Sequence, residues 1–94
     1  MAGYTNKGGR SNVVSASHYI VKAGKFTTAG GDANESITAA GVVATDIAIV
    51  TLQTAGGTPR TVLTAIPATD AINVVMSGDP STDHILSYVV LRAA

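Results

Sequence analysis

The nine residues from Asp46 to Thr54 constrain the fold of this chain more than any other stretch. They read Asp-Ile-Ala-Ile-Val-Thr-Leu-Gln-Thr, and no other run of this length is as hydrophobic and as rich in β-branched side chains. In an extended strand, Ile47 and Ile49 point to one face, and the other face carries Ala48, Val50 and Leu52. Because both faces are apolar, the pattern predicts a central strand with cover on both sides. Ile49→Asp is therefore expected to unfold the domain.

Five further short strands are expected around this one, separated by turns rich in Gly, Pro, Asn and Asp. They are His18–Ala23, Glu35–Ala39, Arg60–Ile66, Ala71–Met76 and Ile85–Arg92. The first is expected to continue to Thr28 past a bulge or bend at Gly24. Residues 55–59 read as a hairpin loop that pairs the strands on either side, and Pro67 is expected to end the second of them. No stretch has a convincing helical period with caps.

This pattern predicts an all-β protein, a small antiparallel β-sandwich or barrel of six or seven strands. Residues 1–17 are expected to form an extended, flexible N-terminal arm, because Gly, Ser and Asn dominate there and the apolar residues have no period. Residues 18–94 form the compact β domain. The arm carries few apolar side chains, Tyr4 and the pair Val13-Val14, which suit either an arm that orders on a partner or a plain disordered terminus.

The composition indicates a thin core and a surface that makes contacts with other proteins. The 94 residues include no Cys, no Trp and one Phe, and only 13% are charged. A core without large aromatics or disulfides often needs contacts between subunits for stability. A solvated monomer usually carries about twice this share of charged residues, so we interpret the deficit as surface used for protein contacts. The alternative is a compact domain that is merely poor in charge.

The net charge is zero, but the charges are segregated along the chain. Residues 1–31 hold four Lys or Arg and no acid, whereas residues 32–94 hold six acids and two Arg. This layout predicts a basic arm that meets an acidic surface. Four basic residues without a row of stacking aromatics do not indicate direct nucleic-acid binding. No apolar run approaches the roughly 20 residues of a membrane span, and no secretory signal is present, so we expect a protein made in the cytoplasm.

Two polar groupings contain residue types that bind metal ions. Asp79, Ser81 and Asp83 have the spacing of the first ligands of a calcium loop, but His84 and Val90 stand where that loop needs Gly and Glu. A turn explains this cluster better. His18 and His84, with Asp83, suggest a metal site only if the starts of the first and last strands lie close together. Structural histidines at strand ends are the preferred interpretation.

No arrangement for nucleophilic catalysis is evident either. Ser81 and Ser87 lie near His84 in sequence, but the strained elbow of serine hydrolases is missing. The sequence therefore predicts a protein that is not an enzyme, with no cofactor, no metal and no small-molecule substrate.

The chain resembles the head decoration (cement) proteins of tailed bacteriophages. The resemblance lies in a short chain without Cys that is rich in Ala, Thr, Val and Gly, with an arm over residues 1–17 and short strands from His18 to Arg92. It is clearest in residues 33–54 and in the ending Asp-Pro-Ser-Thr-Asp-His-Ile-Leu-Ser-Tyr-Val-Val-Leu-Arg, residues 79–92. The resemblance implies a homotrimer on the outer capsid surface that bridges subunits of the major capsid protein and is assembled in the host cytoplasm.

The resemblance also implies a role for the arm, which would lie along the capsid and add a strand to a capsid sheet. The anchoring residues would be Tyr4, Val13 and Val14, and the charge contacts would be Lys7 and Arg10. Two other functions remain open. One is a structural component of a phage tail, baseplate or fibre, and the other is a free small β-sandwich that binds a carbohydrate or peptide.

Overall fold

The computed structural model describes residues 17–94 as an all-β domain without helices. The six strands are β1 (His18–Thr27), β2 (Asn34–Thr38), β3 (Ile47–Thr54), β4 (Val62–Ala68), β5 (Ala71–Met76) and β6 (Ile85–Ala93). All of the predicted strands are present, and β5 has the predicted bounds. The described part of the chain has no helix long and apolar enough to cross a membrane.

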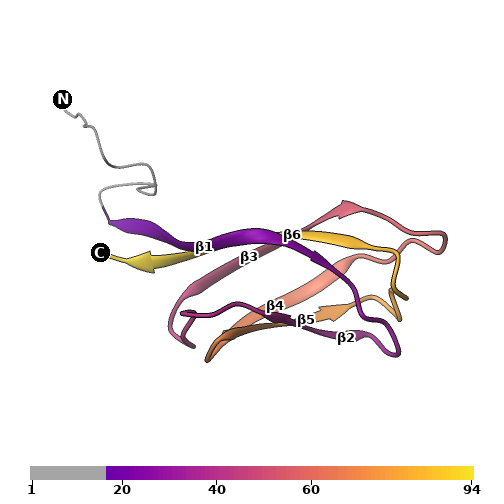
Figure 1. Ribbon diagram of the computed structural model, residues 1–94, viewed down its shortest axis with the longest axis horizontal. Helices are drawn as coiled ribbons and strands as arrows, with labels where there is room; N and C mark the ends of the chain where they lie inside the picture. Colours follow the sequence, from indigo (N-terminus) through magenta and orange to yellow (C-terminus); the bar gives the residue numbers. More distant parts are fainter. Residues whose placement is uncertain (1–16) are drawn as a thin grey trace.

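The strands form two antiparallel three-stranded sheets, ordered β1-β6-β3 and β2-β5-β4. Figure 1 shows them as two layers, with β1, β6 and β3 above and β2, β5 and β4 below. The two layers are not joined by a ladder, so the domain is a β-sandwich. The chain leaves the upper layer after β1, returns for β3, and returns again for β6, which is inserted between them.

The prediction that residues 46–54 form the central strand was wrong. All of this run except Asp46 forms β3, which is an edge strand, and β6 and β5 are the central strands. The inner face of β3 packs on the core, whereas Ile47 is 46% exposed and Ile49 is 45% exposed on the outer face. A strand that is hydrophobic on both faces can therefore still have one face exposed to solvent.

The connection between β3 and β4 also differs from the prediction. The two strands belong to different sheets, so residues 55–61 cross from one layer to the other instead of forming a hairpin. The partner of β4 is β5, and the two are joined by a tight turn at Thr69 and Asp70, where Asp70 has a φ of 57°. Pro67 does not end β4 but lies within it. An edge strand tolerates proline, because half of its N–H groups need no partner in the sheet.

Strand β1 runs unbroken past Gly24, contrary to the expected bulge there. The irregularity lies instead at Val21, between Ile20 and Lys22. Gly24 stands opposite Tyr88 of β6, and a Cβ at this position would lie 2.8 Å from the Tyr88 hydroxyl oxygen. The glycine therefore makes room for the Tyr88 ring, which packs over β1 and against the core.

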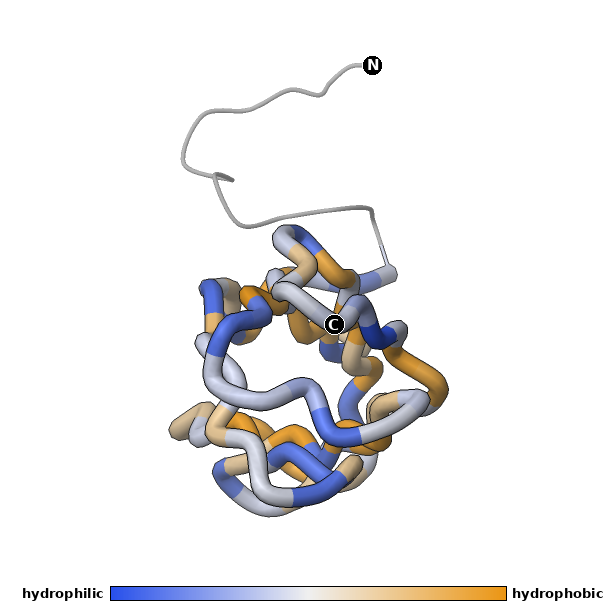
Figure 2. The backbone as a smooth tube through the Cα atoms, turned by 90° about the vertical axis from the view of Figure 1, so that its right-hand side faces the viewer, coloured by the Kyte–Doolittle hydropathy of each residue, from blue (hydrophilic) through white to orange (hydrophobic). Residues whose placement is uncertain are grey.

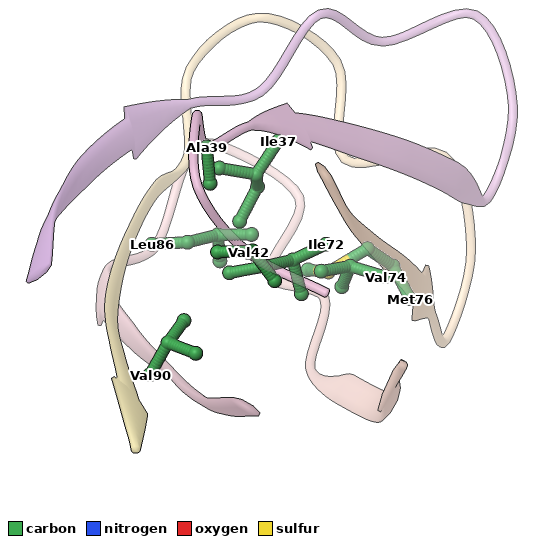
Figure 3. Packing of buried hydrophobic residues seen from close by; sticks show 8 residues of the cluster. All are labelled: Ile37, Ala39, Val42, Ile72, Val74, Met76, Leu86 and Val90. Atoms are coloured by element: carbon green, nitrogen blue, oxygen red, sulfur yellow. The ribbon is translucent and has the colours of Figure 1, made fainter. Parts of the chain in front are cut away.

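The core lies between the two layers and is aliphatic. Its fully buried hydrophobic residues come from both central strands, from β2 and from the turn after it (Figure 3): Ile37, Ala39, Val42, Ile72, Val74, Met76, Leu86 and Val90. Figure 2 views the layers end on and shows hydrophobic residues in both. On β6, Leu86 and Val90 are buried and Tyr88 packs against the core, so residues 86, 88 and 90 face inward and residues 85, 87, 89 and 91 face outward.

Candidate interaction surface

The outer face of the β1-β6-β3 sheet carries a continuous apolar surface three strands wide. Residues directly opposite one another in antiparallel strands lie on the same face. The register places Ile20, Leu91 and Ile47 in one cross-strand row, and Ala23, Val89 and Ile49 in the next such row. All six face away from the core, and none is fully buried. We call these six residues the apolar face.

The outer face of the other sheet is different in character. Its cross-strand rows mix polar and apolar side chains, as in Ser36, Asn73 and Ile66. Ile66 is 58% exposed and Leu63 is 62% exposed, but Asn73 and Thr64 are their neighbours on this face. Single exposed apolar residues are normal on a protein surface, whereas a contiguous patch marks an interaction site. The contrast between the two sheets therefore selects the apolar face.

A polar row borders the apolar face on one side. Beyond Ile49, the next row holds Lys25, Ser87 and Thr51, and the Ser87 hydroxyl donates a hydrogen bond to the Gln53 side chain. An apolar centre with a polar rim is the usual composition of a protein–protein interface.

An ion pair between the partly exposed Arg92 and the buried Asp46 closes the end of the sandwich next to the apolar face. The Arg92 Nε donates to Asp46 Oδ1 at 2.7 Å, and the Nη2 group donates to Asp46 Oδ2 and to the Gly41 carbonyl, both at 2.8 Å. The backbone N–H of Val43 also donates to the Asp46 carboxylate, whose side chain is only 1% exposed. This bidentate pair fastens the end of β6 to the turn that leads into β3.

The same contacts determine the charge states of the pair. The hydrogen bonds from Arg92 hold the pKa of the Asp46 carboxyl below its ordinary value, against the opposing effect of burial. The hydrogen bond to Asp46 in turn raises the pKa of Arg92 above its ordinary value. Both groups therefore stay charged at neutral pH, and their role is structural.

At the opposite end of the sandwich, the His84 ring is held by two hydrogen bonds, and the residue is 1% exposed. The backbone N–H of Arg60 donates to His84 Nε2 at 3.1 Å, so Nε2 is the unprotonated nitrogen and Nδ1 donates to Asp83 at 2.9 Å. Asp83 also accepts from the N–H of Gly57, which lowers the pKa of its carboxyl. This arrangement ties the β3–β4 crossing to the loop before β6.

The candidate metal and calcium groupings do not come together. His18 pairs with Ala93 at one end of β6, whereas His84 precedes the other end, so the two histidines lie at opposite ends of the sandwich. Asp79 caps a turn by accepting from the N–H groups of Gly31 and Ser81, while Asp83 binds elsewhere. Within residues 17–94 no group of three or more His, Cys, Asp or Glu side chains could hold a metal ion.

Neither serine candidate hydrogen-bonds to the His84 ring. Ser87 faces outward on β6, and its hydroxyl donates to the Gln53 side chain. Both ring nitrogens of His84 are bonded to Asp83 and to the backbone of Arg60, so neither Ser81 nor Ser87 has this histidine as its base. No ligand-sized pocket opens among the described residues.

The arm residues that the sequence analysis singled out lie outside the described residues: Tyr4, Lys7, Arg10, Val13 and Val14. The sequence pattern alone did not identify the apolar face. Its signal was present in β3, where Ile47 and Ile49 match the inner residues in hydrophobicity, but the register with β6 is needed to join them to Val89 and Leu91.

Comparison of the chain with models of known protein families, with curated proteins and with solved structures found no match.

Proposed function

We propose that this protein is a structural virion protein that decorates the outer surface of a bacteriophage capsid, with the major capsid protein as its partner. The observation that carries the proposal is the apolar face on the β1-β6-β3 sheet. In this arrangement the six side chains pack against an apolar patch on capsid subunits, and the polar row at Lys25, Ser87 and Thr51 forms the rim of the contact.

Two further features support a role based on protein contacts. The chain has a low share of charged residues, and its basic residues are concentrated before residue 32. The resemblance to decoration proteins links both features to an arm and a body that bind the same shell. In such an assembly each contact is modest, and the many copies on one particle add to the stability of the shell.

Add-back binding to stripped shells tests the proposal. Shells are freed of this protein with mild denaturant, mixed with purified protein, and pelleted, and the bound copies are counted by quantitative gel. We expect wild type to rebind and Val89→Lys, which places a charge in the middle of the apolar face, to rebind at least about tenfold more weakly. Ile66→Lys is the matched control on the other sheet and is expected to rebind like wild type.

Two results would overturn the proposal. One is wild-type protein that does not rebind to shells, and the other is a folded Val89→Lys variant that rebinds as well as wild type. Because Val89 is half-buried on the central strand, circular dichroism is used first to confirm that the variant is folded. Ala23→Lys, at a more exposed position in the same row, replaces it if it is not.

A further inference from the structure

The four edge strands of the sandwich differ in how well they are protected against pairing with another strand. Natural sheets block their edges with lysines, prolines, bulges, inward-pointing charges or very short strands. Three of the four edges here use these devices. β1 has Lys22, Lys25 and a bulge at Val21, and β2 has only five residues, with Glu35 turned inward and 4% exposed.

The third protected edge is β4, which contains Pro67 and a bulge at Leu63, so only three residues between them are regular. Strand β3 has none of these protections over most of its length. Its eight residues include no charge and no proline, and its one irregularity lies at Gln53, close to its end. Residues 47–52 therefore form a regular, uncharged edge of six residues.

The outer edge of β3 has no hydrogen-bonded strand in the described part of the chain, although β4 of the other sheet comes close to β3. β3 pairs with β6 on one side only. In an antiparallel strand, alternate residues direct their N–H and C=O groups to each side. About half of the backbone groups of residues 47–52 therefore face away from β6, toward the position that a further strand would take.

We propose that β3 pairs with β3 of a second copy of this chain, antiparallel and about a two-fold axis, so that two three-stranded sheets become one six-stranded sheet. Charge favours this occupant. Because residues 47–54 carry no charge, self-pairing sets no like charges opposite each other, whereas β1 would bring its own lysines together. A two-fold contact needs a self-complementary surface, and an uncharged antiparallel edge is one.

The pairing register is limited by the faces of the sheet. A slip of one residue would turn the outer side chains of one copy toward the core side of the other. Two registers keep the outer faces aligned and centre the regular stretch, with either Ile49 or Val50 on the axis. Ile49 of one copy then lies directly opposite Ile49 of the other, or diagonal to it at roughly 7–8 Å.

The association also joins the apolar faces of the two copies side by side, because Ile47 and Ile49 belong both to that face and to the paired edge. It goes beyond the proposed function, since it occurs in free protein and needs no particle. The two-fold dimer differs from the homotrimer that the resemblance implies, and the two are distinguished by mass.

Sedimentation equilibrium of the full chain tests the proposal. We expect wild type to reach twice the 9.4 kDa chain mass as its concentration rises. Hydrogen exchange should show that amides in residues 47–52 become more protected over the same concentration range. Wild type that stays a monomer at all concentrations, or that forms a trimer, would overturn the two-fold dimer.

Charge substitutions at Ile49 locate the axis. Ile49→Lys and Ile49→Glu each place like charges close together across the axis, and each is expected to raise the dimer dissociation constant at least about tenfold. An equal mixture of the two should form a dimer again, because the charges are then opposite. Ile66→Lys, at a position that is also exposed, is the control and should dimerise like wild type.

A variant on the same face separates edge pairing from packing of two apolar faces. Val89 lies in the row of Ile49 but one strand further from the edge, so Val89→Lys would disrupt face packing and leave edge pairing intact. Loss of the dimer in folded Val89→Lys, or a normal dimer in Ile49→Lys, would refute pairing through β3.

Discussion

Replacing two isoleucines by alanine, one at a time, tests which strand holds the core. Ile72 of the central strand β5 is 0% exposed, whereas Ile49 of the edge strand β3 is 45% exposed on the apolar face. The same atoms are removed in both variants, so the difference in the free energy of unfolding reports the difference in surroundings. The sequence pattern alone predicts that Ile49 is the more costly position.

The magnitudes follow from burial. Truncating a fully buried isoleucine to alanine costs about 2–5 kcal/mol, from lost transfer free energy and from the cavity left behind. Truncation of Ile49 leaves no closed cavity, because about half of its side chain is already in water. The change should therefore cost about 1 kcal/mol or less. Ile72→Ala is therefore expected to be at least about twofold more costly than Ile49→Ala.

Urea unfolding followed by circular dichroism measures both costs. With a slope of about 1 kcal/mol per molar urea for a small domain, the midpoint should fall by about 2 M or more for Ile72→Ala and by about 1 M or less for Ile49→Ala. Samples are kept dilute so that dimer dissociation does not contribute at Ile49. If Ile72→Ala is unfolded without urea, Ile72→Val, at about 0.5–1.5 kcal/mol, replaces it against Ile49→Val.

Equal costs at the two positions, or a larger cost at Ile49, would refute the placement of β3 at the edge of the sheet. The same placement changes the expectation for Ile49→Asp, which the sequence pattern predicted to unfold the domain. Since position 49 lies on the outer face, the carboxylate that replaces the isoleucine side chain can remain in water, and the variant is expected to be folded.

Two further predictions concern the ends of the sandwich. A Cβ at Gly56 would overlap the Asp83 carboxylate, whereas a Cβ at Gly57 would lie 3.9 Å from it. Gly56→Ala should therefore lower the thermal midpoint of unfolding in calorimetry, and Gly57→Ala should not. Equal midpoints for the two variants would contradict this. The pKa of Asp46 is lowered in the folded state, so its contribution to stability is complete above its unfolded pKa and is lost as the pH falls through its folded pKa. The urea midpoint of Asp46→Asn should therefore fall less than that of wild type between about pH 5 and pH 2, and parallel pH profiles would contradict it.

The elements of the fold could be predicted because they depend on local patterns. Residues 71–76 alternate between buried and more exposed positions and are bounded by Asp70 and by Ser77-Gly78, so the bounds of β5 could be read from the sequence. These signals need only the period of a strand and the residues that favour turns.

The arrangement of the strands could not be predicted, because it depends on pairing between distant segments. An exposed isoleucine has the same sequence signature as a buried one, so Ile47 and Ile49 suggested a covered strand. The glycines and Pro59 after β3 fit a hairpin, yet the chain crosses there to the other sheet. The apolar face could not be predicted for the same reason, because its six residues come together only when β6 lies between β1 and β3.

Sedimentation of a lysate from cells that make this protein tests the central claim most directly. The lysate is separated on a density gradient, and the protein is followed by immunoblot alongside particles of virus size. The account predicts that wild type travels with the particles and that mild denaturant releases it while the shells stay intact. Protein that remains wholly in the soluble fraction of a lysate containing such particles would contradict the account.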